Sequence, residues 1–74
     1  MSKLPALTPL QIIKILERSG FILDRVRGSH HIYIHSELKK RVTVPLHKRD
    51  LPKGTLSEIL KQAGIDKKEL NDLK

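Results

Sequence analysis

The sequence predicts an α+β domain in which one helix, three antiparallel strands and a second helix follow one another along the chain. Two amphipathic stretches, at residues 9–19 and 55–63, begin at capping residues and predict the helices. Three short runs between the helices predict strands, because they are rich in β-branched residues and alternate apolar with polar side chains. These runs are at residues 21–26, 30–35 and 41–45. A helix followed by a strand meander is typical of α+β folds rather than of parallel sheets.

The first helix has both of its ends marked in the sequence. Thr8 is placed to cap it, Pro9 has the backbone angle of a first helical residue, and Gln11 completes a capping box. Gly20 comes directly after this amphipathic stretch, where a residue in the left-handed conformation commonly ends a helix. The apolar stripe that this helix offers to a core consists of Ile12, Ile13 and Leu16.

The second strand carries alternate side chains on its two faces. Gly28 lies in the tight turn before it, where a positive φ suits glycine. We expect the helices to cover the more aliphatic face of the sheet, which would consist of His30, Ile32, Ile34, Val42 and Val44. The face left open to solvent or a partner would then carry His31, Tyr33, His35, Arg41 and Thr43.

The C-terminal third completes the layout. A capping box at Thr55 predicts the start of the second helix and Gly64 predicts its end. Asp66 is placed to cap a last short helix that would pack Leu70 and Leu73. The predicted fold is therefore αβββα, a three-stranded antiparallel sheet with both helices on one face and a short extra C-terminal helix. By analogy of fold, this is the layout of a double-stranded-RNA-binding domain.

The charge distribution indicates a polyanionic partner. The chain has 15 lysine and arginine residues against 8 acidic ones, a net charge of +7. Eight of the basic residues and only two of the acids lie between Arg25 and Lys53, so this segment supplies most of the net charge. Nucleic acid is the commonest polyanion. With Phe21 and Tyr33 as the only aromatic residues, a platform that stacks several bases is not expected.

Size and composition exclude several other classes of protein. At 74 residues the chain is close to the lower limit for an independent core, so we expect one domain, 1–74, with residues 1–7 as a loose leader. The chain has no cysteine, which excludes a disulfide framework and a thiolate metal site and fits the cytoplasm. The N-terminal residues contain no long apolar run, so we expect neither a signal peptide nor a membrane span.

All four histidines lie in the basic segment: His30, His31, His35 and His47. Imidazole both takes and gives a proton near neutral pH, with an unperturbed pKa of about 6.5. His31 and His35 share a strand face but stand about 13 Å apart, and His30 points the other way, so the pattern predicts no metal site. We expect no cofactor either.

The chemistry that this segment favours is general acid–base cleavage of RNA. A base takes the proton of a ribose 2′-hydroxyl, the oxygen attacks the adjacent phosphorus, and an acid protonates the leaving 5′-oxygen. We expect His30 to be the better-placed catalyst because packing on the helix-covered face would fix its rotamer. The alternative is a structural histidine at the edge of the core. The expected phosphate contacts are the amides of Gly28 and Ser29 and the side chains of Arg25, Arg27, Lys48 and Arg49.

Four stretches of the chain together resemble the HicA family of toxins. They are RGSHHIY at residues 27–33, VTVPLH at 42–47, LPKGTL at 51–56 and ILKQAG at 59–64. The resemblance extends over residues 8–70. It implies the αβββα fold and the activity of a ribosome-independent mRNA interferase, an endoribonuclease that a HicB antitoxin encoded beside it neutralises.

The same resemblance implies roles for single residues. The catalytic histidine of the family lies in the Gly-Ser-His-His step, which maps to His30, with His31 as the other candidate because some relatives keep only one of the two imidazoles. Gly28 also belongs to the motif. Two other interpretations stay open: a catalytically silent RNA- or DNA-binding module of the same fold, and a protein-interaction domain without affinity for RNA.

Overall fold

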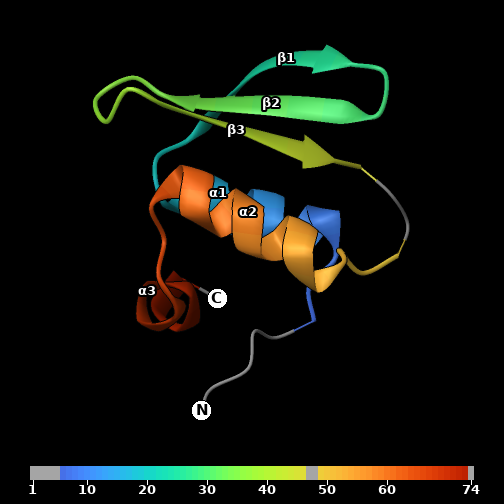
Figure 1. The fold of residues 1–74 in the computed structure, drawn as a ribbon. Coiled ribbons are helices and arrows are strands. Elements are labelled where there is room, and N and C mark those ends of the chain that lie inside the picture. The colour runs from blue at the N-terminus through green and yellow to red at the C-terminus, as the bar shows by residue number, and fades with distance from the viewer. Residues whose placement is uncertain (1–5, 47–48, 74) are drawn as a thin grey trace.

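The computed structural model describes residues 6–46 and 49–73, which form a three-stranded sheet packed on helices (Figure 1). The elements are α1 (Pro9–Arg18), β1 (Ile22–Arg27), β2 (His30–His35), β3 (Lys40–Pro45), α2 (Lys53–Ala63) and α3 (Lys67–Leu73). The strands are antiparallel, in the order β1-β2-β3. Both α1 and α2 lie beneath the same face of the sheet, and α3 lies further from it (Figure 1). The predicted α+β class and αβββα order with a short C-terminal helix are confirmed.

The start of α1 is built as predicted. The Thr8 hydroxyl accepts a hydrogen bond from the Gln11 amide (3.3 Å), and the Gln11 side-chain oxygen accepts one from the Thr8 amide (2.8 Å). These two bonds complete the capping box. After the helix, Gly20 has φ +101°, in the region that favours glycine. The residues that α1 buries are Pro9, Ile12, Ile13, Ile15 and Leu16.

The start of α2 differs from the prediction. The helix begins at Lys53, its N-cap is Pro52, and no side chain caps it, so the predicted capping box at Thr55 is wrong. The Pro52 backbone is extended (φ −56°, ψ 147°), as is usual at an N-cap, and its carbonyl accepts the first helical bond from the Leu56 amide (2.9 Å). Gly64, with φ +73°, ends the helix as predicted.

The ordered core begins earlier in the chain than expected. Leu7, which the prediction assigned to a loose leader, is buried. Its carbonyl accepts a hydrogen bond from the Leu51 amide (2.8 Å), which ties the start of α1 to the start of α2. Residues 1–5 of the predicted leader lie outside the described part of the chain.

The last helix packs as predicted. The Asp66 carboxylate accepts a hydrogen bond from the Glu69 amide (2.8 Å) and so caps α3. Leu70 is fully buried and Leu73 is half-buried against the same core. In the described ranges, no helix is both long enough and apolar enough to cross a membrane.

The face of β2 that packs on the helices is the opposite of the predicted one. Tyr33 pairs with Val42 and His31 pairs with Val44, and residues opposite one another in an antiparallel pair point to the same face. Tyr33, Val42 and Val44 are buried, whereas Ile32 lies opposite the exposed Thr43. The prediction that the isoleucines of β2 face the helices is therefore wrong.

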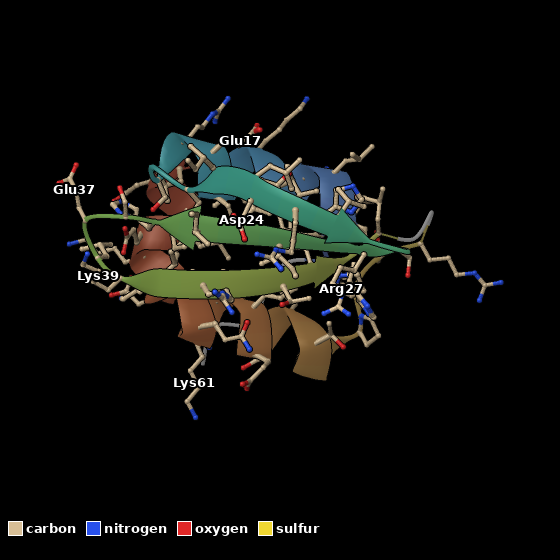
Figure 2. All side chains as sticks on the ribbon, turned by 90° about the horizontal axis from the view of Figure 1, so that it is seen from above. Glu17, Asp24, Arg27, Glu37, Lys39 and Lys61 are labelled. Atoms are coloured by element: carbon tan, nitrogen blue, oxygen red, sulfur yellow. The ribbon has the colours of Figure 1, made fainter. Side chains whose placement is uncertain are left out.

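The physical reason is the pairing register. The predicted arrangement and the observed one differ by a shift of one residue between β2 and β3, and such a shift moves every side chain to the other face. The covered face, as we call the side packed on the helices, carries His31, Tyr33, His35, Val42 and Val44. The open face, which is turned toward the reader in Figure 2, carries Ile22, Arg25, Arg27, His30, Ile32, Ile34, Arg41 and Thr43.

Candidate functional site

The turn between β1 and β2 brings four of the predicted site residues to one corner of the sheet. Gly28 has φ +61°, and nothing lies within 4 Å of the position that a Cβ would take, so the turn is open to solvent and needs glycine only for its backbone. The Ser29 carbonyl accepts a hydrogen bond from the Leu46 amide (2.6 Å), which ties the turn to the chain after β3. Arg27 and His30 flank the turn as cross-strand partners.

The histidines of β2 have three different environments. His30 is exposed on the open face, so the expectation that it packs toward the helices is wrong. His31 is half-buried on the covered face, and its Nδ1 is buried without a hydrogen-bond partner among residues 6–46 and 49–73. His35 accepts a hydrogen bond at Nδ1 from the Leu38 amide (3.2 Å) and meets Phe21 edge-on, with 5.2 Å between ring centroids.

Accessibility therefore distinguishes these imidazoles. A polymer reaches His30 without any rearrangement of the sheet, because none of the helices in the described ranges lies over the open face (Figure 2). His35 braces the β2–β3 hairpin instead, and its distance from His30, five residues along the strand, is about 16 Å. His47, the fourth histidine, lies outside the described residues.

The cations near the turn differ in how far they are neutralised. Arg25 binds Asp24, with 3.1 Å between Nε and the carboxylate oxygen. Asp24 is absent from the predicted site, and it lies near the middle of the open face (Figure 2). Arg27 lies beside His30 and takes part in no ion pair with another described residue. Arg49 is exposed on the segment that leads to α2, and Lys48 lies outside the described residues.

The covered face beneath the site buries Tyr33 together with Val42 and Val44. Burial raises the pKa of the Tyr33 hydroxyl above its usual value, and the nearby Glu17 carboxylate raises it further. A small hollow of about 200 Å³ is lined by Leu7, Gln11, Lys14, Ile15 and Arg18, none of which belongs to the predicted site. In the part of the chain that the structure covers, no three His, Asp or Glu side chains gather to hold a metal ion.

The chain matches the model of a known protein family. The model of the family described as HicA toxin of bacterial toxin-antitoxin matches residues 11–65, which is most of the chain. The chain belongs to the HicA toxin family. No curated protein matches the chain significantly. The family match runs from the first turn of α1 to the end of α2 and includes the turn at Gly28, whereas α3 lies beyond it. As a member of this family, the chain is a toxin of a bacterial toxin–antitoxin system.

Proposed function

We propose that this HicA toxin is an endoribonuclease that cleaves mRNA without a metal ion, with His30 as the residue that transfers protons at the scissile phosphate. The observation that carries the proposal is the exposed imidazole of His30 on the open face, directly after the Gly28–Ser29 turn and beside Arg27. A polymeric substrate needs such an open site, whereas a small substrate is usually enclosed in a pocket.

The chemistry assigns a part to each group at this corner. His30 takes the 2′-hydroxyl proton or donates one to the leaving 5′-oxygen, and a well-placed group of this kind contributes about 10²–10⁴ in rate. The Arg27 guanidinium stabilises the negative charge that develops on the phosphorus oxygens. The amides of Gly28 and Ser29 and the side chains of Arg25, Lys48 and Arg49 are further candidates for phosphate contacts. His31 is the less favoured catalyst because it is half-buried on the covered face.

Purified variants test this assignment directly. We expect His30→Ala to lower RNA cleavage by about 10²–10⁴ while RNA binding persists, because His30 is exposed and the fold does not depend on it. His31→Ala is the matched control, and it should keep most of the activity. Cleavage should also persist in excess chelator. Persistent cleavage by the His30→Ala/His31→Ala double variant would contradict the proposal, and RNA binding without any cleavage by the wild type would favour the silent binding module.

The partner that we propose is a HicB-type antitoxin that covers the open face. The motivation is the surface itself, which combines exposed arginines with an apolar residue, Ile22, that is 61% exposed. An acidic partner with apolar residues complements such a surface, and its binding would exclude RNA by occlusion. A structure of the complex in which His30 stayed open to solvent would contradict this mode of inhibition.

A further inference from the structure

The β2–β3 hairpin, at the opposite end of the sheet from the Gly28 turn, contains a hollow that the proposed mechanism does not use. Figure 2 shows Arg27 and Lys39 at these two ends. The hollow has a volume of about 470 Å³ and is lined by Ile34, His35, Ser36, Lys39, Lys40 and Arg41. It is therefore open enough for a hydrated phosphate group, and half of its lining residues are cations.

The positive charge of this hollow is not neutralised by the protein. No acidic residue lines it, and the Glu37 side chain projects off the hairpin tip (Figure 2). Within the described ranges, Lys39 and Arg41 take part in no ion pair, in contrast to Arg25, which binds Asp24. The Lys40 ammonium lies against Gly64 at the C-terminal end of α2, where the helix dipole favours a cation. Lys39 and Arg41 are thus the two charges available to an external anion.

The hairpin that holds these charges is braced against the core. The bond from the Leu38 amide to His35 Nδ1 closes the loop, and Phe21 packs edge-on against the same ring. A Cβ added to Gly20 would lie 2.7 Å from His35 Nε2, so this close approach requires glycine. These contacts hold the backbone of the hairpin against the core before any ligand binds, which lowers the entropic cost of binding.

Lys39 occupies a backbone conformation that disfavours its side chain. Its φ is +57°, and it is the one residue other than glycine in the described part of the chain with a positive φ. Such strain is common where a side chain is needed for function rather than for folding. Glycine would relieve the strain but would remove the ammonium group from the hollow.

Arg41 lies on the same face of the sheet as His30. Arg41 pairs with Ile34, and Pro45, four residues further along β3, pairs with His30. The separation along the strands is about 13 Å. A stacked nucleic-acid strand advances about 3.4 Å per nucleotide, so this separation corresponds to about four nucleotides. The exposed Thr43 lies between the two positions.

We propose that the hairpin hollow is a second phosphate-binding subsite, in which Lys39 and Arg41 bind the RNA backbone about four nucleotides from the bond at His30. Phe21 and Tyr33 are both buried, so neither stacks on a base, and the contact is to sugar and phosphate rather than to sequence. This inference rests on the proposed function, because the RNA that is cleaved at His30 would continue along the open face to the hairpin.

The test compares a hairpin variant with a variant of equal charge on RNAs of two lengths. The hairpin variant is Lys39→Gly/Arg41→Ala, and the control is Lys61→Ala/Lys68→Ala, which removes two exposed cations from the helices. The short substrate is a dinucleotide that cannot reach from His30 to the hairpin. The long substrate is an RNA of about 12 nucleotides, within the usual range of single-strand sites.

We expect the hairpin variant to lose about ten-fold or more in kcat/KM on the long RNA and to cleave the dinucleotide like the wild type. The charge control should cleave both RNAs nearly as the wild type does. In a His30→Ala background, the slope of log affinity against log salt for the long RNA should become shallower by about 1.4, the value for two lost single-strand contacts. Lys39→Gly alone should raise the urea midpoint and still weaken long-RNA binding, a combination that a purely structural lysine would not give.

Three outcomes of the RNA assays would overturn the inference. They are an equal loss in the charge control, an equal loss on the dinucleotide, and unchanged binding of the long RNA by the hairpin variant. Loss of antitoxin binding with unchanged RNA binding would also overturn it, since the hollow would then belong to the partner protein. If the wild type cleaves neither RNA, the proposed function fails, but the binding comparison in the His30→Ala background still decides whether the hollow holds RNA.

Discussion

Tyr33 and Val42 lie opposite each other in the pairing of β2 with β3, and both side chains are buried against the helices. Because side chains alternate along a strand, this pair determines the orientation of its neighbours. His31 and His35 turn to the covered face with Tyr33, and His30 turns to the open face. The single aromatic residue of the sheet thereby places the proposed catalytic imidazole in contact with solvent.

Tyr33 should make the stability of the protein fall at alkaline pH. Burial, and then the Glu17 carboxylate, raise the pKa of the Tyr33 hydroxyl above its ordinary value of 10.0. Above that pH the unfolded chain loses a proton that the folded chain keeps, so the free energy of unfolding falls as pH rises. The contribution is complete below pH 10 and is lost as pH rises through the folded pKa.

Denaturant titrations from about pH 8 to about pH 11 measure this effect. Lysines also titrate in this range, so the control is Tyr33→Phe, which keeps the ring and removes only the hydroxyl. We expect a shallower alkaline loss of stability in the phenylalanine variant. Equal slopes in the two proteins would contradict the assignment to Tyr33.

Two glycines with positive φ should differ in their tolerance of alanine. Gly28→Ala meets no neighbour, so it should cost only the backbone penalty of about 1–2 kcal/mol, and Gly28→Asn should cost less. Gly20→Ala carries a backbone penalty too and also places its Cβ 2.7 Å from His35 Nε2. Urea unfolding measures all three variants, and a Gly20→Ala loss no larger than that of Gly28→Ala would show that the His35 ring moves aside freely.

The third helix should contribute strongly to stability although it lies outside the family match. Leu70 is fully buried, so Leu70→Ala should lower the free energy of unfolding by about 2–5 kcal/mol. Leu73 is half-buried, so Leu73→Ala serves as the comparison and should cost less. Denaturant midpoints of the two variants give the answer, and a wild-type midpoint for Leu70→Ala would mean that α3 does not pack on the core in solution.

The two predicted capping boxes should respond differently to mutation. Thr8→Ala removes a side chain that accepts a bond from the Gln11 amide, and it should cost about 1 kcal/mol. Thr55→Ala removes no capping bond, because α2 begins at Lys53, and it should cost clearly less. Thermal or urea unfolding distinguishes the two variants. A larger loss of stability in Thr55→Ala than in Thr8→Ala would indicate that Thr55 does cap α2 in solution.

The boundaries of α1 could be predicted because they depend on residues close in sequence. Thr8 and Gln11 are three positions apart, and Gly20 acts through its own backbone angle. The start of α2 was harder to predict because two local signals competed there. Thr55 offered a side-chain cap, but Pro52, whose carbonyl accepts the bond from the Leu56 amide, occupies the N-cap position instead.

The covered face of β2 could not be predicted from β2 alone. Both of its faces carry apolar side chains, isoleucines on one and Tyr33 on the other. The alternation of side chains along β2 is therefore compatible with either face being packed on the helices. The hairpin decides between them, because its loop at residues 36–39 places His35 opposite Lys40. The expectation for β3 was right, since its valines lie on one face and its exposed polar residues on the other.

The amino-acid pattern alone was thus enough to predict the order of the elements, both ends of α1, the glycine turn at Gly28 and the motifs that resemble the HicA family. These features arise from residues near one another in the chain, whose backbone preferences act locally. The packed fold was needed to show that His30 faces solvent and that Arg41 lies on the same face. Both depend on the register between strands and on which side chains the helices bury, and a shift of one residue would have reversed them.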